Sequence, residues 1–362
     1  MKWSKTAVAL AIGLSACRQL DEPPVVATSR YVEYASDSFE PCPEFMSALD
    51  AYIEAVYEDL GADPPSGLLL RYNHAPDGLR GLCAEGAPGC ACVSSSCDWP
   101  TDRSIATVFS TLPAHHHEIA HAIAGDAGYW TDRPFIDEGF AERYSSPDGS
   151  WAVVMPQDEP DLESLLSSAG PVDYFEALVF AQALVDRHGL GAYLSFIERL
   201  ASSDAAATGA YEVEFGESLH ELSQTVVGST YCVEPLAQCS DAALVWDSST
   251  LVVGLADEQC EVEQRFGPAQ FQSYAASGAY RERRATVHFD VAGEYLLEKP
   301  PSVDVALIAC DQACDPFADW QPFMVYGETA STTGFVNSGE YELVVLYPSD
   351  TELAGEVRLT PN

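Results

Sequence analysis

The hydrophobic periodicity of the chain changes near residues 228–242, and this change limits the folds that the chain can adopt. Before it, apolar residues recur at helical spacing, as at 45–60 and 174–188. After it, short alternating or apolar runs are separated by Gly, Ser, Asp and Pro. A helical part followed by a series of strands is typical of the α+β class. We therefore predict a mostly helical domain with a small N-terminal sheet at 31–230, followed by an antiparallel β-sandwich domain at 240–362.

The same patterns predict individual elements. Helices are expected at 45–60, 113–124, 135–144, 174–188, 190–200 and 211–226, and strands of the small sheet at 68–72 and 105–109. Strands of the second domain are expected at 244–246, 251–253, 286–291, 303–308, 323–326, 341–347 and 356–359. The cysteine-rich segment 83–97 is expected to be a loop.

The first residues are typical of a bacterial export signal. Lys2 and Lys5 precede an apolar stretch, 7–14, that is too short to span a bilayer. The phrase Leu-Ser-Ala-Cys that ends at Cys17 resembles a lipobox, in which the Cys becomes a lipidated first residue. We predict a lipoprotein signal peptide at 1–16, with an ordinary signal peptide as the alternative.

A lipidated Cys17 would make the lipid the membrane anchor, followed by a polar, Pro-containing tether at 17–30. Arg18 stands where an Asp is associated with inner-membrane retention in some bacteria. We therefore expect a lipid-anchored protein of the bacterial cell envelope, with the outer membrane favoured.

The charge balance restricts the partners. The chain has 17 Lys+Arg against 56 Asp+Glu, a net charge of −39. Such a surface repels phosphate backbones and anionic headgroups, which argues against nucleic acid as a partner. The acidity fits solubility in a salty extracellular medium.

Cysteine use indicates an oxidising compartment. If Cys17 is lipidated, ten of the eleven cysteines remain, which suggests up to five disulfides in an exported protein. Four of them crowd together at Cys83, Cys90, Cys92 and Cys97, where a structural zinc site is the alternative. This cluster lacks two separated C-x₂-C knuckles, so disulfides are favoured, and their pairing stays open.

A metal-binding pattern lies at 115–121, where His-His-His-Glu-Ile-Ala-His contains one HExxH register: His117, Glu118 and His121. On a helix, positions i and i+4 share a face, so both imidazoles can reach one metal ion. Glu118 lies beside that face, where it can take a proton from a zinc-bound water. A tetrahedral zinc site with one water requires a third protein ligand.

The phrase Asp137-Glu-Gly-Phe-Ala-Glu142 supplies a third ligand. It lies on the next expected helix, beyond a loop, so Glu138 can return to the metal. Glu142 is one turn further on the same face, where a carboxylate would hold a histidine's free N–H. Asp137 is expected to be a cap or turn residue.

HEIAH followed by DEGFAE resembles the gluzincin zinc metallopeptidases, in particular the peptidase MA-like family, which is related to the aminopeptidase N and thermolysin groups. The resemblance extends over about residues 40–225. It implies a gluzincin-like catalytic domain in which His117, His121 and Glu138 bind one catalytic Zn²⁺ and Glu118 is the general base. Since a Tyr opens the corresponding helix in the family, it also implies that Tyr174 stabilises the oxyanion, with a core or helix-start aromatic as the alternative.

The resemblance implies hydrolysis of peptide bonds, with a peptide or protein as substrate. No G-x-M-E-N phrase precedes the HExxH motif. In the aminopeptidases that phrase supplies the carboxylate that holds a free amino terminus, so an endopeptidase is favoured. The alternative is a non-catalytic adhesion or scaffold lipoprotein with a peptidase-like domain. The four intact chemical residues favour the enzyme, because a decayed site does not need the Glu of HExxH for its structure.

Overall fold

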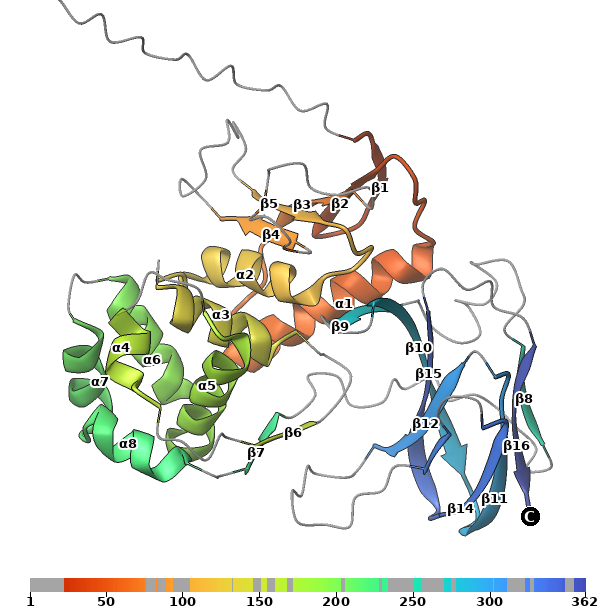
Figure 1. The fold of residues 1–362 in the computed structure, drawn as a ribbon. Helices are drawn as coiled ribbons and strands as arrows, with labels where there is room; N and C mark the ends of the chain where they lie inside the picture. The colour runs from red at the N-terminus through yellow and green to blue at the C-terminus, as the bar shows by residue number, and fades with distance from the viewer. Residues whose placement is uncertain are drawn as a thin grey trace, which may run out of the picture.

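The computed structural model describes residues 23–75, 83, 87, 89–93, 105–131, 133–145, 151–154, 160–167, 172–202, 206–227, 230–233, 250–254, 270–274, 278–301, 303–310, 323–325, 329–348 and 355–362. Within them the chain forms eight helices, two five-stranded sheets, a four-stranded sheet and a two-stranded ribbon (Figure 1). The predicted α+β class is confirmed. Among these residues no helix has the length and apolarity needed to cross a membrane.

The N-terminal sheet contains strands β1 (Val25–Thr28), β2 (Val32–Ser36), β3 (Leu70–His74), β4 (Gly89–Cys92) and β5 (Ala106–Ser110). Their order is β1-β2-β3-β5-β4; β2, β3 and β5 are parallel, and the outer strands β1 and β4 are antiparallel to their neighbours. β1 lies within the segment expected to be a tether, because Val25, Ala27 and Thr28 pair with β2, with a bulge at Val26, instead of remaining in solvent.

The eight helices pack beside this sheet. They are α1 (Pro43–Leu60), α2 (His116–Ala127), α3 (Pro134–Arg143), α4 (Leu162–Ser167), α5 (Tyr174–His188), α6 (Leu190–Ala201), α7 (Ala207–Phe215) and α8 (Leu219–Val226). The ribbon pairs β6 (Trp151–Val154) with β7 (Thr230–Val233). One apolar core joins the sheet to the helices, with Tyr34, Ile53, Ile119, Phe140 and Phe196 among its buried members.

Three local predictions differ from the structure. Helix α2 begins and ends three residues later than expected, because its stop is Gly128 at φ 85° and not Gly125. The expected helix at 211–226 is interrupted at Gly216, whose φ of 72° ends α7 before α8 starts. Residues 89–92, expected to be loop, form strand β4.

The C-terminal part forms two antiparallel sheets. The first, in the order β13-β12-β15-β10-β9, contains β9 (Gln270–Tyr274), β10 (Gly278–Phe289), β12 (Asp304–Ala309), β13 (Phe323–Val325) and β15 (Gly339–Pro348). The second, in the order β14-β11-β16-β8, contains β8 (Leu251–Gly254), β11 (Gly293–Glu298), β14 (Ser331–Val336) and β16 (Glu356–Pro361). The expected strand at 244–246 lies outside the described residues.

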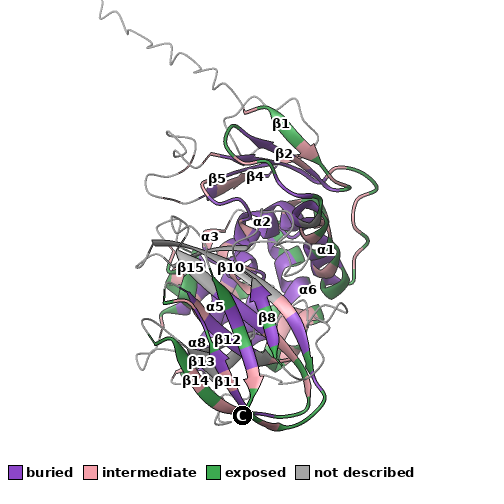
Figure 2. Cartoon of the chain, turned by 90° about the vertical axis from the view of Figure 1, so that its right-hand side faces the viewer, coloured by how far each residue is buried: buried purple, intermediate pink, exposed green. Residues whose placement is uncertain are grey.

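Both of these sheets contribute to one apolar cluster. Phe289, Leu307 and Leu343 enter it from the first sheet, and Leu297 and Leu359 enter it from the second. Buried residues alternate with more exposed ones along β8, β11 and β16 of the second sheet (Figure 2), whereas Val305, Ala306 and Leu307 of β12 are all buried. The alternation follows from the period of two in a strand whose one face is covered.

Candidate metal centre

Helix α2 carries the HExxH residues in a fully enclosed setting. It contacts β4 and β5 on one side and α1 and α3 on others, and every residue from His116 to Ala124 is buried (Figure 2). A helix enclosed in this way does not need an amphipathic pattern, which explains its Ala-rich sequence. The polar His117, Glu118 and His121 are thus buried inside the protein and require partners there.

Helix α3 brings two carboxylates to these histidines. Its start is fixed by the buried Asp137, whose carboxylate accepts hydrogen bonds from the Thr131 hydroxyl at 2.7 Å and from the Thr131 and Arg133 amides, both at 3.0 Å. The expected capping role of Asp137 agrees with these contacts. Gly139 allows α3 to approach α5, because a Cβ there would lie 2.5 Å from the Ala177 carbonyl oxygen.

Three ligand atoms converge between α2 and α3. The Nε2 atoms of His117 and His121 lie 3.1 Å apart. The Oε2 atom of Glu138 lies 2.9 Å from Nε2 of His117 and 3.2 Å from Nε2 of His121. Among the described residues these three side chains form the one group of His, Cys, Asp or Glu close enough to hold a metal ion.

The size of this triangle fits zinc. Ligand atoms that bind a tetrahedral Zn²⁺ at about 2.0–2.1 Å lie about 3.3 Å from one another. The three observed separations, 2.9, 3.1 and 3.2 Å, are close to that edge length. Two imidazoles and one carboxylate are also a donor set that zinc takes in catalytic sites, with a fourth position left open.

Glu142 lies on the far side of His117 from the ligand triangle. Its Oε1 atom is 3.0 Å from Nδ1 of His117, an ion-pair contact that places a carboxylate beside this nitrogen and leaves Nε2 free to bind a cation. Burial alone would lower the pKa of His117, but the contacts with Glu138 and Glu142 outweigh it and raise that pKa. Glu138 is only partly buried; desolvation would raise its pKa, but the contacts with His117 and His121 outweigh it and lower that pKa, which keeps the carboxylate ionised.

Glu118 lies beside strand β4. Its side chain is buried, and burial raises its pKa while the nearby His121 and His117 oppose the shift. A Cβ on Gly89 would lie 2.9 Å from Cγ of Glu118 and 2.4 Å from Nδ1 of His115, so the strand passes directly over both side chains. A desolvated carboxylate in this position is a stronger base than one in water.

Tyr174 begins helix α5 and lies beside His117. Its ring centroid lies 5.6 Å from that of His117, and the side chain is half exposed. Desolvation, together with Glu138, Glu118 and Glu142, raises the pKa of Tyr174 to about 12. The phenol therefore keeps its proton at neutral pH and can donate a hydrogen bond to a group bound at the site.

The structure thus brings together the six predicted side chains of the zinc site, whereas Cys17 lies outside the described residues. It also adds two features that the sequence analysis missed. The Trp130 ring lies 5.5 Å from that of His121, and strand β4 covers Glu118. A glycine between two cysteines, Gly89, only weakly indicates that the chain passes close to another segment. Nothing in the sequence indicates that the Trp130 ring lies against His121.

We expect Glu142→Gln to weaken zinc binding about 10- to 100-fold, because an amide holds the Nδ1 proton of His117 less strongly than a carboxylate. Competition against a chromophoric chelator measures this affinity. Glu212→Gln, on the exposed surface of α7, is the matched control and should bind zinc like the wild type. An unchanged affinity in Glu142→Gln would show that Glu142 plays no part in the site.

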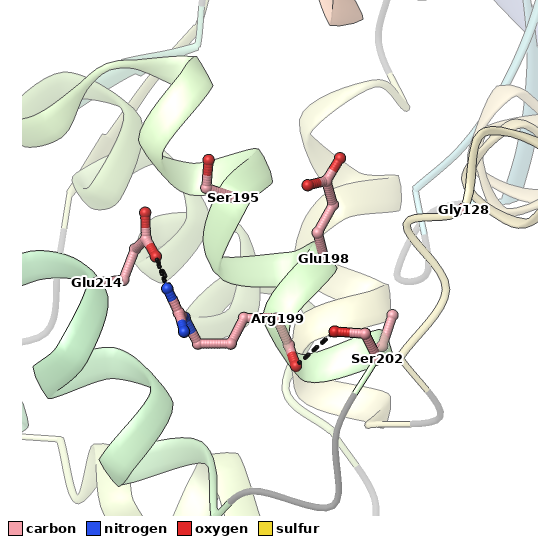
Figure 3. Close-up of a pocket in the computed structure, with 7 residues that line it drawn as sticks. Gly128, Ser195, Glu198, Arg199, Ser202 and Glu214 are labelled. Carbon is pink, nitrogen blue, oxygen red and sulfur yellow. Dashed lines mark hydrogen bonds and ion pairs between the residues drawn. The ribbon is translucent and has the colours of Figure 1, made fainter.

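A pocket lies at the C-terminal end of α6, with Gly128 from the end of α2 among its lining residues (Figure 3). It is lined by Ser195, Glu198, Arg199, Ser202 and Glu214, and Arg199 is paired with Glu214 at 2.9 Å. None of the predicted site residues lines it.

The chain matches no protein-family model and shows no significant similarity to a curated protein.

Proposed function

We propose that this protein is a zinc-dependent peptidase of the gluzincin type, which hydrolyses internal peptide bonds of a peptide or protein. The observation that carries the proposal is the convergence of His117, His121 and Glu138 on one point, with Glu118 beside them and Glu142 behind His117. We further propose that the two C-terminal sheets form a β-sandwich accessory domain, since they share one apolar cluster.

A Zn²⁺ held by His117, His121 and Glu138 would acidify a water molecule and polarise the carbonyl of the scissile bond. Glu118 accepts the proton of the attacking water and passes it to the leaving amine. Glu142 holds His117 in the tautomer whose Nε2 faces the ligand triangle. The Tyr174 phenol donates a hydrogen bond to the oxyanion that develops on the carbonyl oxygen.

A peptide substrate is supported by the position of β4. Among the described residues this strand is the last in its sheet; it pairs with β5 on one side, and it passes over Glu118. An extended peptide can pair with such an edge, and main-chain hydrogen bonds would then hold it along the site. We also propose that lipidation of Cys17 attaches the enzyme to the outer membrane of a bacterial envelope.

Two measurements on the purified full-length protein test this function together. Metal analysis should find about one zinc per chain, and labelled casein should be cleaved at internal bonds. A chelator should abolish cleavage, and added Zn²⁺ should restore it. A protein that binds zinc but cleaves neither casein nor any member of a peptide library would instead support the non-catalytic scaffold lipoprotein.

Tyr174→Phe is expected to lower kcat about 10²-fold with KM nearly unchanged, because the lost hydrogen bond forms as the oxyanion develops. Steady-state kinetics on a quenched fluorescent peptide measure both constants. Tyr57→Phe is the matched control: its hydroxyl donates to Asp126 at 2.6 Å, so its loss should lower Tm and leave kcat unchanged. An unaltered kcat in Tyr174→Phe would leave Tyr174 as a structural aromatic.

A further inference from the structure

Strand β4 is short, and it packs against Glu118, the side chain beside the ligand triangle. Its four residues, Gly89 to Cys92, pair with β5 from Ser110 to Thr107. Gly89 approaches Glu118 and His115 so closely that a single methyl group would not fit. The position of β4 therefore determines how much space the Glu118 carboxylate has.

Disulfides restrain this strand. Cys90 is bonded to Cys83, with 5.5 Å between their Cα atoms, and Cys92 is also disulfide-bonded. Cys90 is thus adjacent in sequence to the glycine that touches Glu118. These bonded cysteines hold no thiolate available to zinc, so the alternative of a structural zinc site in this cluster is wrong.

The metal ligands do not depend on the same restraint. His117, His121 and Glu138 lie on α2 and α3, neither of which contains a cysteine. Their spacing is set by helix geometry, by the Asp137 contacts and by the packing of Gly139 against α5. Loosening β4 should therefore disturb Glu118 while the ligand triangle stays intact.

We propose that the Cys83–Cys90 disulfide is a positioning element for Glu118: it holds β4 against this carboxylate and thereby sets its orientation for catalysis. The proposal rests on the proposed hydrolytic function for its kinetic consequence. Its structural consequence, a tightly held β4, is independent of that function. Loss of the bond should lower kcat and leave zinc bound.

The proposal makes hydrolysis sensitive to reductants. A phosphine breaks the S–S bond, takes one oxygen atom from water to become the phosphine oxide, and leaves protonated thiols on Cys83 and Cys90. A phosphine suits the experiment because, unlike a dithiol, it offers no thiolate that competes for zinc.

The test compares the full-length wild type with the double variant Cys83→Ser/Cys90→Ser. We expect zinc content to stay the same, kcat on labelled casein to fall about 10²-fold, and KM to change little, since small displacements of a catalytic group have effects of this size. Hydrogen exchange followed by mass spectrometry should show faster exchange at 89–92 but unchanged exchange at 116–127. Phosphine treatment should reduce the activity of the wild type to that of the equally treated variant, and any loss that treatment causes in the variant belongs to other disulfides.

Gly89→Ala tests the same contact without a change in disulfides, and it serves if the double variant does not fold. Its methyl group would lie 2.4 Å from Nδ1 of His115 and 2.9 Å from Cγ of Glu118, so β4 must move away from both side chains, and we expect a similar loss in kcat with zinc retained. Gly191→Ala, where a Cβ meets nothing within 4 Å, is the matched control and should keep wild-type kinetics.

Wild-type kcat, together with unchanged exchange at 89–92 in the double variant, would overturn the proposal. Loss of zinc together with activity would also overturn it, because the disulfide would then support the whole site. If the wild type itself cleaves nothing, the proposed function fails, and the exchange measurement alone decides whether the disulfide holds β4.

Discussion

Glu118→Gln is expected to lower kcat by about 10²- to 10⁴-fold while the protein keeps about one zinc per chain. The amide has nearly the same size as the carboxylate, so the contact with β4 is preserved, but it cannot accept the proton of the attacking water. His117, His121 and Glu138 remain to bind the ion. Kinetics on a quenched fluorescent peptide and metal analysis of the same sample measure the two effects.

The pattern of the two effects distinguishes the possible roles of Glu118. Retained zinc with lost hydrolysis identifies Glu118 as the proton acceptor. Glu212→Gln, exposed on α7, controls for the removal of one negative charge and should behave as the wild type. If Glu118→Gln remained fully active, Glu118 would not be the general base.

The second large effect is expected from His121→Ala, which should reduce the zinc content to less than about 0.1 per chain and abolish hydrolysis. Two ligands remain, and they cannot hold the ion in the way three do. The substitution also leaves Oε2 of Glu138 without one of its two histidine partners in the buried site. Metal analysis after gel filtration against a weak chelator measures the loss.

A histidine elsewhere provides the control for this variant. His220→Ala, on the exposed face of α8, should keep zinc and activity. Circular dichroism shows whether His121→Ala remains folded, which separates loss of the ligand from loss of the protein. A folded His121→Ala variant with full zinc content would place the metal somewhere else.

Local rules were sufficient to predict that His117 and His121 share one face of a helix. The i, i+4 spacing of His117 and His121 needs nothing beyond the helix period, and the structure places both Nε2 atoms 3.1 Å apart. Glu138 and Glu142 share a face of α3 by the same rule. The loop that returns Glu138 to the histidines has no local signal, so its placement depended on the resemblance around the phrase DEGFAE.

The neighbourhood of Glu118 could not be predicted, because it is made by contacts between distant segments. Gly89 and Glu118 are far apart in the sequence, with strand β5 between them, and a four-residue strand with two cysteines has no clear hydrophobic pattern. The end of helix α2 could not be predicted for the same reason, because a contact with a distant segment decides it. Gly125 was expected to stop α2, but inside the helix it permits close contact with Val93, and Gly128 ends the helix instead.

The sequence predicted that the C-terminal part consists of strands, but it did not predict every strand or its full length. Apolar runs located β12 and β15 and alternation located β16, because each strand contributes side chains to the shared cluster. Strand β14 was not predicted: Ser331–Val336 shows Thr, Gly and an exposed Phe335 instead of clear alternation. Its place at the end of the sheet order explains the weak pattern, since an edge strand is covered less.

Zinc K-edge X-ray absorption on the purified full-length protein tests the central claim most directly. We predict a zinc ion bound by nitrogen and oxygen atoms at about 2.0–2.1 Å, with the multiple-scattering signature of two imidazoles from His117 and His121 and no sulfur ligand. Zinc bound by sulfur at about 2.3 Å, or a protein without zinc after purification in zinc-containing buffer, would contradict the account.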